Sequence, residues 1–213
     1  MSVNDLLQRN REWAEAQLKV DPEYFSRHVE GQKPRLLWIG CSDSRVAAEQ
    51  LLNCGPGEVF IHRNVANVVA YNDINIAAVI QYAVEVLKVP DIVICGHYEC
   101  GGVKAACAKE VTTGYIGDWL MITGWAKRWV DDRLGWRKDR MPKDEYYRHV
   151  VEENVLLQVK HLSHLSMIRE AWKRDPSSPR LHGWVYDIST GLIKVVMDGM
   201  EFENEVKEEE SKH

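Results

Sequence analysis

The sequence predicts one α/β domain: a mostly parallel central β-sheet flanked by helices, with an antiparallel edge strand and an N-terminal helical arm. Three observations support this fold class. Short apolar runs alternate with helical patterns, which is typical of a parallel sheet. The last two runs are separated only by a turn, as in an antiparallel pair. Helical patterns also precede the first strand, and these form the arm.

The arm comprises two predicted helices. Residues 3–19 form an amphipathic pattern whose apolar side chains lie roughly on one side: Leu6, Leu7, Trp13, Ala14 and Leu18. Residues 21–31 predict a second helix, in which Asp21 is the N-cap, Pro22 takes the first helical position and Gly31 is the stop signal.

Short apolar runs predict three buried strands, at residues 35–40, 57–63 and 91–96. A helix over residues 73–88 separates the second strand from the third, and Asp73 is its expected cap. The polar stripe of this helix is narrow. We therefore expect it to be covered on most sides, by the sheet and by another subunit.

The second half of the chain predicts mostly helix over residues 115–175, followed by a pair of strands joined by a turn at the letters STG. We divide the 213 residues into a single domain with three parts. These are the arm (1–33), the α/β core (34–200) and a charged tail (201–213) that we expect to be solvated or frayed.

The composition excludes several classes of protein. The net charge of -5 gives no electrostatic reason to expect a nucleic-acid partner. No apolar run approaches ~20 residues, so we expect no membrane span, and the first residues lack a secretory pattern. Five cysteines are too few, and odd in number, for a disulfide scaffold. A reducing compartment, and hence a cytoplasmic location, is the prediction.

Two polar motifs directly follow predicted strands: CSDSR after the first and GHYECGG after the third. Because parallel strands open their carboxyl ends on one edge of a sheet, these loops can bring together four metal-binding side chains: Cys41, Asp43, His97 and Cys100. Thiolates and an imidazole suit zinc, and three protein ligands leave a fourth position. Taken singly, each motif has a simpler interpretation, as an incidental cysteine or a structural ion pair.

The motifs CSDSR, HRNVAN and GHYECGG, in this order and each beside a strand, resemble those of the β-class carbonic anhydrases. The resemblance runs from about Trp38 to Gly102 and resumes at LHGWVYD. It implies reversible hydration of carbon dioxide to bicarbonate and a proton, by attack of a zinc-bound hydroxide. It also implies one Zn²⁺ per chain and a homodimer that often assembles into a homotetramer.

The resemblance assigns Cys41, His97 and Cys100 as the zinc ligands. It assigns Asp43 and Arg45 as a catalytic dyad, in which Arg45 holds Asp43 off the metal and release of Asp43 caps the metal. The alternative is that Asp43 is a permanent fourth ligand of a structural zinc. Ala47 stands where many relatives have proline, and it touches no ligand.

The resemblance also implies a carbon dioxide pocket, shared with a second subunit and including five residues: Phe60, Val65, Tyr82, Gly101 and Gly102. A subset of the family has a second, inhibitory bicarbonate site away from zinc, at the positions of Trp38, Arg63 and Tyr186. An arginine fork suits a small oxyanion. The alternative for this trio is a buried aromatic pair with one structural arginine.

Two other functions remain open at this point. One is hydrolysis of carbon disulfide or carbonyl sulfide on the same zinc core, and the other is a non-catalytic zinc-stabilised binding protein. Several further side chains are interpreted as structural: Cys54, Cys95, Cys107, Trp119, Trp125, Trp129, His161 and His164.

Overall fold

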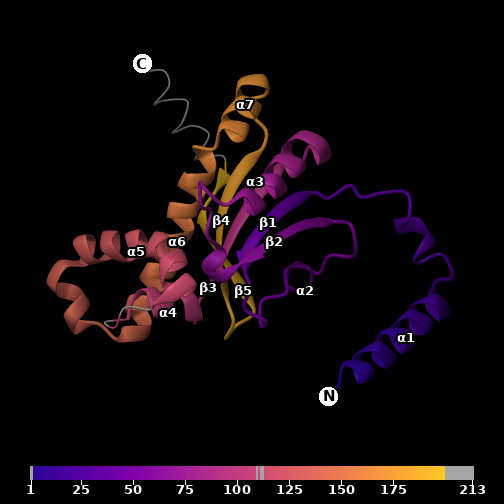
Figure 1. Ribbon diagram of the computed structural model, residues 1–213, viewed down its shortest axis with the longest axis horizontal. Coiled ribbons are helices and arrows are strands. Elements are labelled where there is room, and N and C mark those ends of the chain that lie inside the picture. The colour runs from indigo at the N-terminus through magenta and orange to yellow at the C-terminus, as the bar shows by residue number, and fades with distance from the viewer. Residues whose placement is uncertain (1, 109, 111–112, 200–213) are drawn as a thin grey trace.

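The computed structural model describes residues 2–108, 110 and 113–199, and it contains a five-stranded sheet in the order β2-β1-β3-β4-β5 (Figure 1). The strands are β1 Leu36–Cys41, β2 Val59–Asn64, β3 Asp91–His97, β4 Arg180–Asp187 and β5 Leu192–Met197. The first four are parallel, and β5 pairs with β4 antiparallel at the edge. The predicted fold class is confirmed.

The register of the sheet brings the polar motifs to one edge. At the carboxyl end of β1, Cys41 lies beside Asn64 of β2, and Gly40 lies beside Cys95 of β3. Strand β3 continues for two residues beyond its pairing with β1, and its last residue, His97, pairs with Tyr186 of β4. The loops that follow β1, β2 and β3 therefore begin at nearly the same height.

The amino end of β3 is joined to β4 by a charged cluster. Asp91 accepts hydrogen bonds from Arg180 at 2.8 and 3.0 Å and from His182 Nε2 at 3.0 Å. Burial raises the pKa of Asp91, but the bonds to Arg180 and His182 outweigh it and the net effect is a lowered pKa. The ionised carboxylate thus stabilises the parallel pairing of these strands.

Helices cover the two faces of the sheet unequally. They are α1 Val3–Val20, α2 Ala48–Leu52, α3 Ile74–Gln81, α4 Gly101–Ala106, α5 Gly114–Leu134, α6 Lys143–Ser163 and α7 Ser166–Arg174. On one face, α3 to α7 bury the larger core cluster, which includes Ile39, Ile94 and Val155. On the other face a smaller cluster contains Trp38 and Cys95, and α2 alone among the helices of the described residues contributes to it.

The N-terminal arm is only partly as predicted. Helix α1 is confirmed and begins with a capping box between Ser2 and Asp5, but none of its residues is buried, and it extends away from the sheet (Figure 1). The predicted helix over 21–31 is wrong. That segment forms turns and a short 3₁₀ helix, η1 Ser26–His28, because it has no buried face to support a helix of its length.

The helix predicted over 73–88 is present but changes its winding. Asp73 caps it through a 3.0 Å bond from the N–H of Asn75. The α-helix α3 passes into a π-helix, η3 Tyr82–Leu87, and ends at Lys88 in the left-handed region. Helical periodicity predicted its extent, while the wider turn was not visible in the pattern.

The remaining helical prediction, residues 115–175, is confirmed by α5, α6 and α7, with the 3₁₀ helix η4 Gly135–Arg140 between the first two. None of the helices within the described residues is long and apolar enough to cross a lipid bilayer. The predicted charged tail, 201–213, lies outside the described residues.

Candidate active site

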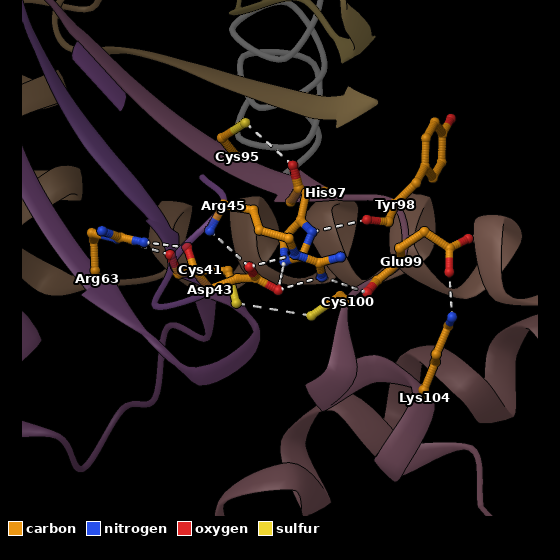
Figure 2. A network of polar contacts seen from close by, with 11 residues as sticks. Cys41, Asp43, Arg45, Arg63, Cys95, His97, Tyr98, Glu99, Cys100 and Lys104 are labelled. Carbon is orange, nitrogen blue, oxygen red and sulfur yellow. Dashed lines mark hydrogen bonds and ion pairs between the residues drawn. The ribbon is translucent and has the colours of Figure 1, made fainter. Parts of the chain in front are cut away.

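A compact group of metal-binding side chains lies where β1 and β3 end. Cys41 is the last residue of β1, His97 is the last residue of β3, and Cys100 is the N-cap of α4. Their ligand atoms all lie within 4.8 Å of one another, and the two sulfur atoms are 3.9 Å apart (Figure 2). All three residues are buried, so the sequence prediction that these loops meet is confirmed.

His97 is oriented to offer a lone pair to this group. Its Nδ1 lies 2.9 Å from the carbonyl oxygen of Tyr98. Because a carbonyl only accepts, Nδ1 carries the proton and Nε2 has the lone pair. Nε2 is buried and has no hydrogen-bond partner in the described part of the chain. A buried unpaired nitrogen beside two sulfur atoms fits a zinc ion, which accepts one histidine and two thiolates.

The protonation of each thiol depends on that of the other, because their sulfur atoms are in contact. A hydrogen bond from Cys100 lowers the pKa of Cys41, outweighing the opposing effect of burial, and the N–H groups of Asp43 and Ala66 lower it further. The same contact raises the pKa of Cys100, because its ionisation would place a second negative charge beside the first. A divalent cation removes this penalty, so metal binding and loss of the second proton are linked.

Asp43 and Arg45 form a two-pronged ion pair beside the metal group. Arg45 Nε donates to Asp43 Oδ1 at 2.9 Å and Nη2 donates to Oδ2 at 2.7 Å, while the backbone N–H of Arg45 adds a bond of 3.0 Å. Arg45 holds the pKa of Asp43 well below its usual range. The ionised Asp43 Oδ2 lies 3.8 Å from His97 Nε2, on the metal-facing side of the histidine (Figure 2).

The backbone approaches the metal group closely at Gly102. A Cβ atom added there would lie 3.0 Å from Val65 Cγ1 and 3.1 Å from Ala66 Cβ, which explains the glycine. Helix α4 begins at Gly101, two residues before Val103. The N–H groups of Val103 and Gly102 oppose, but do not outweigh, the rise in the pKa of the Cys100 thiol that Cys41 and burial cause.

The predicted pocket residues fall into two places. Val65, Gly101 and Gly102 lie near the metal group, whereas Phe60 stacks on Tyr82 with ring centroids 5.8 Å apart. Phe60 pairs with Leu37, four residues before Cys41, which is about 13 Å along the strand. Within the described chain, this stacked pair is therefore remote from the metal group.

The three residues of the predicted second anion site belong to β1, β2 and β4. Trp38 and Tyr186 belong to the same buried cluster on the thinly covered face of the sheet, and Arg63 pairs with Gly40, next to which the Trp38 indole lies. Arg63 donates to the carbonyl oxygens of Cys41, at 2.9 Å, and Asp43, at 2.6 Å. Arg63 thus holds the loop that carries the first zinc-ligand candidate and the Asp43–Arg45 pair (Figure 2).

Three polar side chains near the site were not identified from the sequence as functional. Trp119 of α5 donates to the carbonyl of Val65 at 2.8 Å, and Asn154 and Gln158 of α6 hydrogen-bond the segment that follows. The sequence offered one signal for the two amides, namely their spacing of four residues within a stretch that is otherwise rich in Val and Leu.

Trp125 is 54% exposed, so its interpretation as a packing anchor is wrong for the single chain.

Comparison with known proteins agrees with this site. The family model described as carbonic anhydrase matches residues 36–193. A carbonic anhydrase of Emericella nidulans is 38% identical over 190 residues, covering 89% of this chain and 81% of that protein. Another, from Pseudomonas aeruginosa, is 37% identical over 182 residues, covering 83% of this chain and 79% of that protein.

Similar solved structures belong to the same family of enzymes. One described as a tetrameric β-carbonic anhydrase of Sordaria macrospora has a TM-score of 0.81 and 37% identity, covering 90% of this chain and 95% of that one. The Coccomyxa β-carbonic anhydrase in complex with acetazolamide has a TM-score of 0.83 and 37% identity, covering 94% of this chain and 90% of that one. Together with the Cys41, His97 and Cys100 group, these matches show that the chain belongs to the β-class carbonic anhydrases.

Proposed function

We propose that this protein catalyses the zinc-dependent, reversible hydration of carbon dioxide to bicarbonate and a proton at Cys41, His97 and Cys100, and that Asp43 and Arg45 control access to the metal. The observation that carries the proposal is the position of an ionised Asp43, 3.8 Å from the unpaired Nε2 of His97 and clamped by Arg45. A purely structural zinc site needs no such clamped carboxylate.

The roles of the protein groups follow from their geometry. Zinc, when bound, supplies Lewis acidity that makes water a nucleophile near neutral pH. Three protein ligands leave a fourth position, and Asp43 Oδ2 lies 3.8 Å from His97 Nε2. While Arg45 holds it, Asp43 can accept a hydrogen bond from the attacking water and orient that water toward carbon dioxide.

The same carboxylate can inhibit. If the bonds from Arg45 break, Asp43 is close enough to become the fourth ligand and to exclude water. The exposed Arg45 side chain is also bonded to the carbonyl of Glu99 at 3.3 Å, which holds the guanidinium across the two loops. The equilibrium between the clamped and capped positions of Asp43 then sets the active fraction.

We further propose that bicarbonate shifts this equilibrium through Arg63, with Trp38 and Tyr186 as the other residues of an allosteric site. Arg63 binds the carbonyl of Asp43 itself, so an anion that draws Arg63 away removes a support of the clamped loop. An anion acts only as far as it binds the capped state more tightly. Arg63→Ala should weaken inhibition by added bicarbonate, and unchanged inhibition would exclude this site.

We propose that the functional unit is at least a homodimer and that it assembles into a homotetramer, because a structurally similar β-carbonic anhydrase of Sordaria macrospora is described as tetrameric. Three features support this: α1 buries no residue, α2 is the one helix of the described chain on the smaller cluster, and Phe60 and Tyr82 are remote from their own metal group. In a dimer, the stacked pair of one chain can complete the pocket of the other. Light scattering that shows an active monomer would contradict this.

A cytoplasmic location is also proposed. All five cysteines are free in the structure, and two of them form the metal group, which requires reduced thiols. The overall function is tested by stopped-flow hydration of carbon dioxide on protein of measured zinc content. Activity that rises in proportion to bound zinc supports it, and stoichiometric zinc without activity contradicts it.

A further inference from the structure

Tyr98 lies between His97 and Cys100, and hydrogen bonds hold both ends of its backbone. Its N–H donates to the carbonyl of Tyr186 on β4 at 2.9 Å, and its own carbonyl accepts a bond from His97 Nδ1, also at 2.9 Å. The next residue, Glu99, has a φ of 63°, in the left-handed region that non-glycine residues seldom adopt. A turn of this kind persists only when its surroundings hold it.

The side chain of Tyr98 points away from the metal group (Figure 2) and is anchored on α6. Tyr98 is 4% exposed, and its hydroxyl donates to Glu152 Oε1 at 2.6 Å. The guanidinium of Arg148 lies 3.9 Å from the centre of the ring, and it is itself bonded to Asp187 Oδ2 at 3.1 and 3.2 Å. The ring is therefore held at its face and at its hydroxyl.

Glu152 is held in its ionised form. Lys194 of β5 donates at 2.7 Å to Glu152 Oε1, the same oxygen that accepts from Tyr98. Burial raises the pKa of Glu152, but the bonds from Lys194 and Tyr98 outweigh it and the net effect is a lowered pKa. An ionised acceptor strengthens the hydrogen bond from the hydroxyl. Helix α6 and strand β5 thus jointly hold the residue that follows His97.

These contacts form one continuous series from the edge of the sheet to the metal group. Lys194 and Glu152 hold the side chain of Tyr98, and the carbonyl of Tyr98 holds the Nδ1 proton of His97, which leaves Nε2 with its lone pair. We infer that Tyr98 and Glu152 are positioning residues for the metal centre, which fix the carbonyl that orients the His97 imidazole. This inference rests on the proposed role of His97 as a zinc ligand. The alternative is that Tyr98 contributes to packing alone.

The expected consequence is weaker metal binding, separate from any loss of stability. Loss of a partner that orients a metal-binding histidine typically weakens metal affinity about 10- to 100-fold. Tyr98 and Glu152 act through a backbone carbonyl that every variant retains, so we expect the lower end of this range, about 10-fold. The visible absorption bands of cobalt(II) bound in place of zinc depend on the arrangement of its ligands, and they should shift in the same variants.

The test uses two matched pairs of variants. Tyr98→Phe removes one hydroxyl, and its control is Tyr146→Phe, which removes the same group and a 2.9 Å bond to a carboxylate elsewhere on α6. Glu152→Met removes the acceptor, and its control is Glu153→Met, because Glu153 is 9% exposed and forms a 2.5 Å ion pair of its own. Zinc affinity is measured by competition with a chelator, and cobalt(II) spectra are recorded on the full-length protein.

Two further variants test the hydrogen bond itself. Glu152→Gln keeps an acceptor oxygen for the Tyr98 hydroxyl, so it should retain most of the zinc affinity that Glu152→Met loses. The double variant Tyr98→Phe/Glu152→Met should lose no more affinity than the worse single variant, because both single substitutions break the same bond.

The outcomes separate this inference from the proposed function. An approximately 10-fold loss of zinc affinity with shifted cobalt bands in Tyr98→Phe and Glu152→Met, and wild-type values in both controls, supports it. Affinity and spectra equal to those of the controls overturn it, whatever the loss of thermal stability, and so does a Glu152→Gln protein as weak as Glu152→Met. If Glu152→Met does not fold, Tyr98→Phe decides. These results overturn the inference alone, whereas a wild-type protein that binds no zinc would contradict the proposed function as well.

Discussion

Replacing Arg45 with alanine tests the control of the metal by Asp43. The substitution removes both side-chain bonds to the carboxylate, at 2.9 and 2.7 Å, and leaves the 3.0 Å bond from the backbone N–H of residue 45. Asp43 stays ionised at neutral pH, because a carboxylate without its partner still titrates near 4. The freed Asp43 then competes for the fourth position of the metal.

The size of the effect follows from exposure. The Arg45 side chain is 51% exposed and Asp43 is 16% exposed, so solvent screens the pair. An exposed ion pair contributes little, so losing this pair should shift the equilibrium by up to about fivefold toward the capped state. We expect kcat/KM for hydration to fall by about that factor while zinc content stays at the wild-type value.

The assay is stopped-flow hydration of carbon dioxide, with zinc measured on the same samples. Arg133→Ala is a matched control, because Arg133 is 55% exposed and pairs at 2.5 Å with Glu153, which is 11% exposed, away from the metal group. It should leave the rate unchanged. Near-normal turnover by zinc-loaded Arg45→Ala would refute the proposed role of the pair.

Three further predictions concern stability, regulation and assembly. Asp91 has a lowered pKa in the folded state, so its contribution is present above the unfolded pKa near 4 and is lost as pH falls through the folded pKa. Asp91→Asn should therefore reduce the free energy of unfolding by about 1–3 kcal/mol at pH 7 and progressively less in acid, by denaturant titration; an equal loss at all pH values would contradict this. Tyr186→Phe should weaken inhibition by bicarbonate, measured as rate against bicarbonate concentration, and an unchanged response would contradict an anion site there. Deletion of residues 2–20 should reduce the number of subunits per particle, calculated from the mass that light scattering gives. An unchanged number of subunits would show that α1 is not part of the interface.

The sequence was sufficient to place the metal group because its signals are local. Each ligand motif directly follows an apolar run, and parallel strands bring their carboxyl ends to one edge. The positions of Cys41, His97 and Cys100 depend only on those two facts. Asp43 and Arg45 pair within a single loop, at a spacing of two residues, so their contact also required no long-range information.

Other features depend on packing that no local pattern contains. The segment 21–31 has helix signals at both ends, yet without a buried face it forms turns. Arg63 binds carbonyls 20 and 22 residues earlier in the chain, and Asn154 binds Ala66 across 88 residues. Such contacts between distant residues become visible only when α6 and the sheet are placed together.

The most direct test of the central claim is the zinc content and hydration rate of the wild-type protein and of Cys100→Ser, purified without chelator. The sulfur of Cys100 lies 3.9 Å from that of Cys41, so its loss removes one of three ligands from a buried group. We expect one zinc per chain and rapid hydration in the wild type, and loss of both in the variant. A wild-type protein without stoichiometric zinc, or a Cys100→Ser protein with full zinc and activity, would contradict the account.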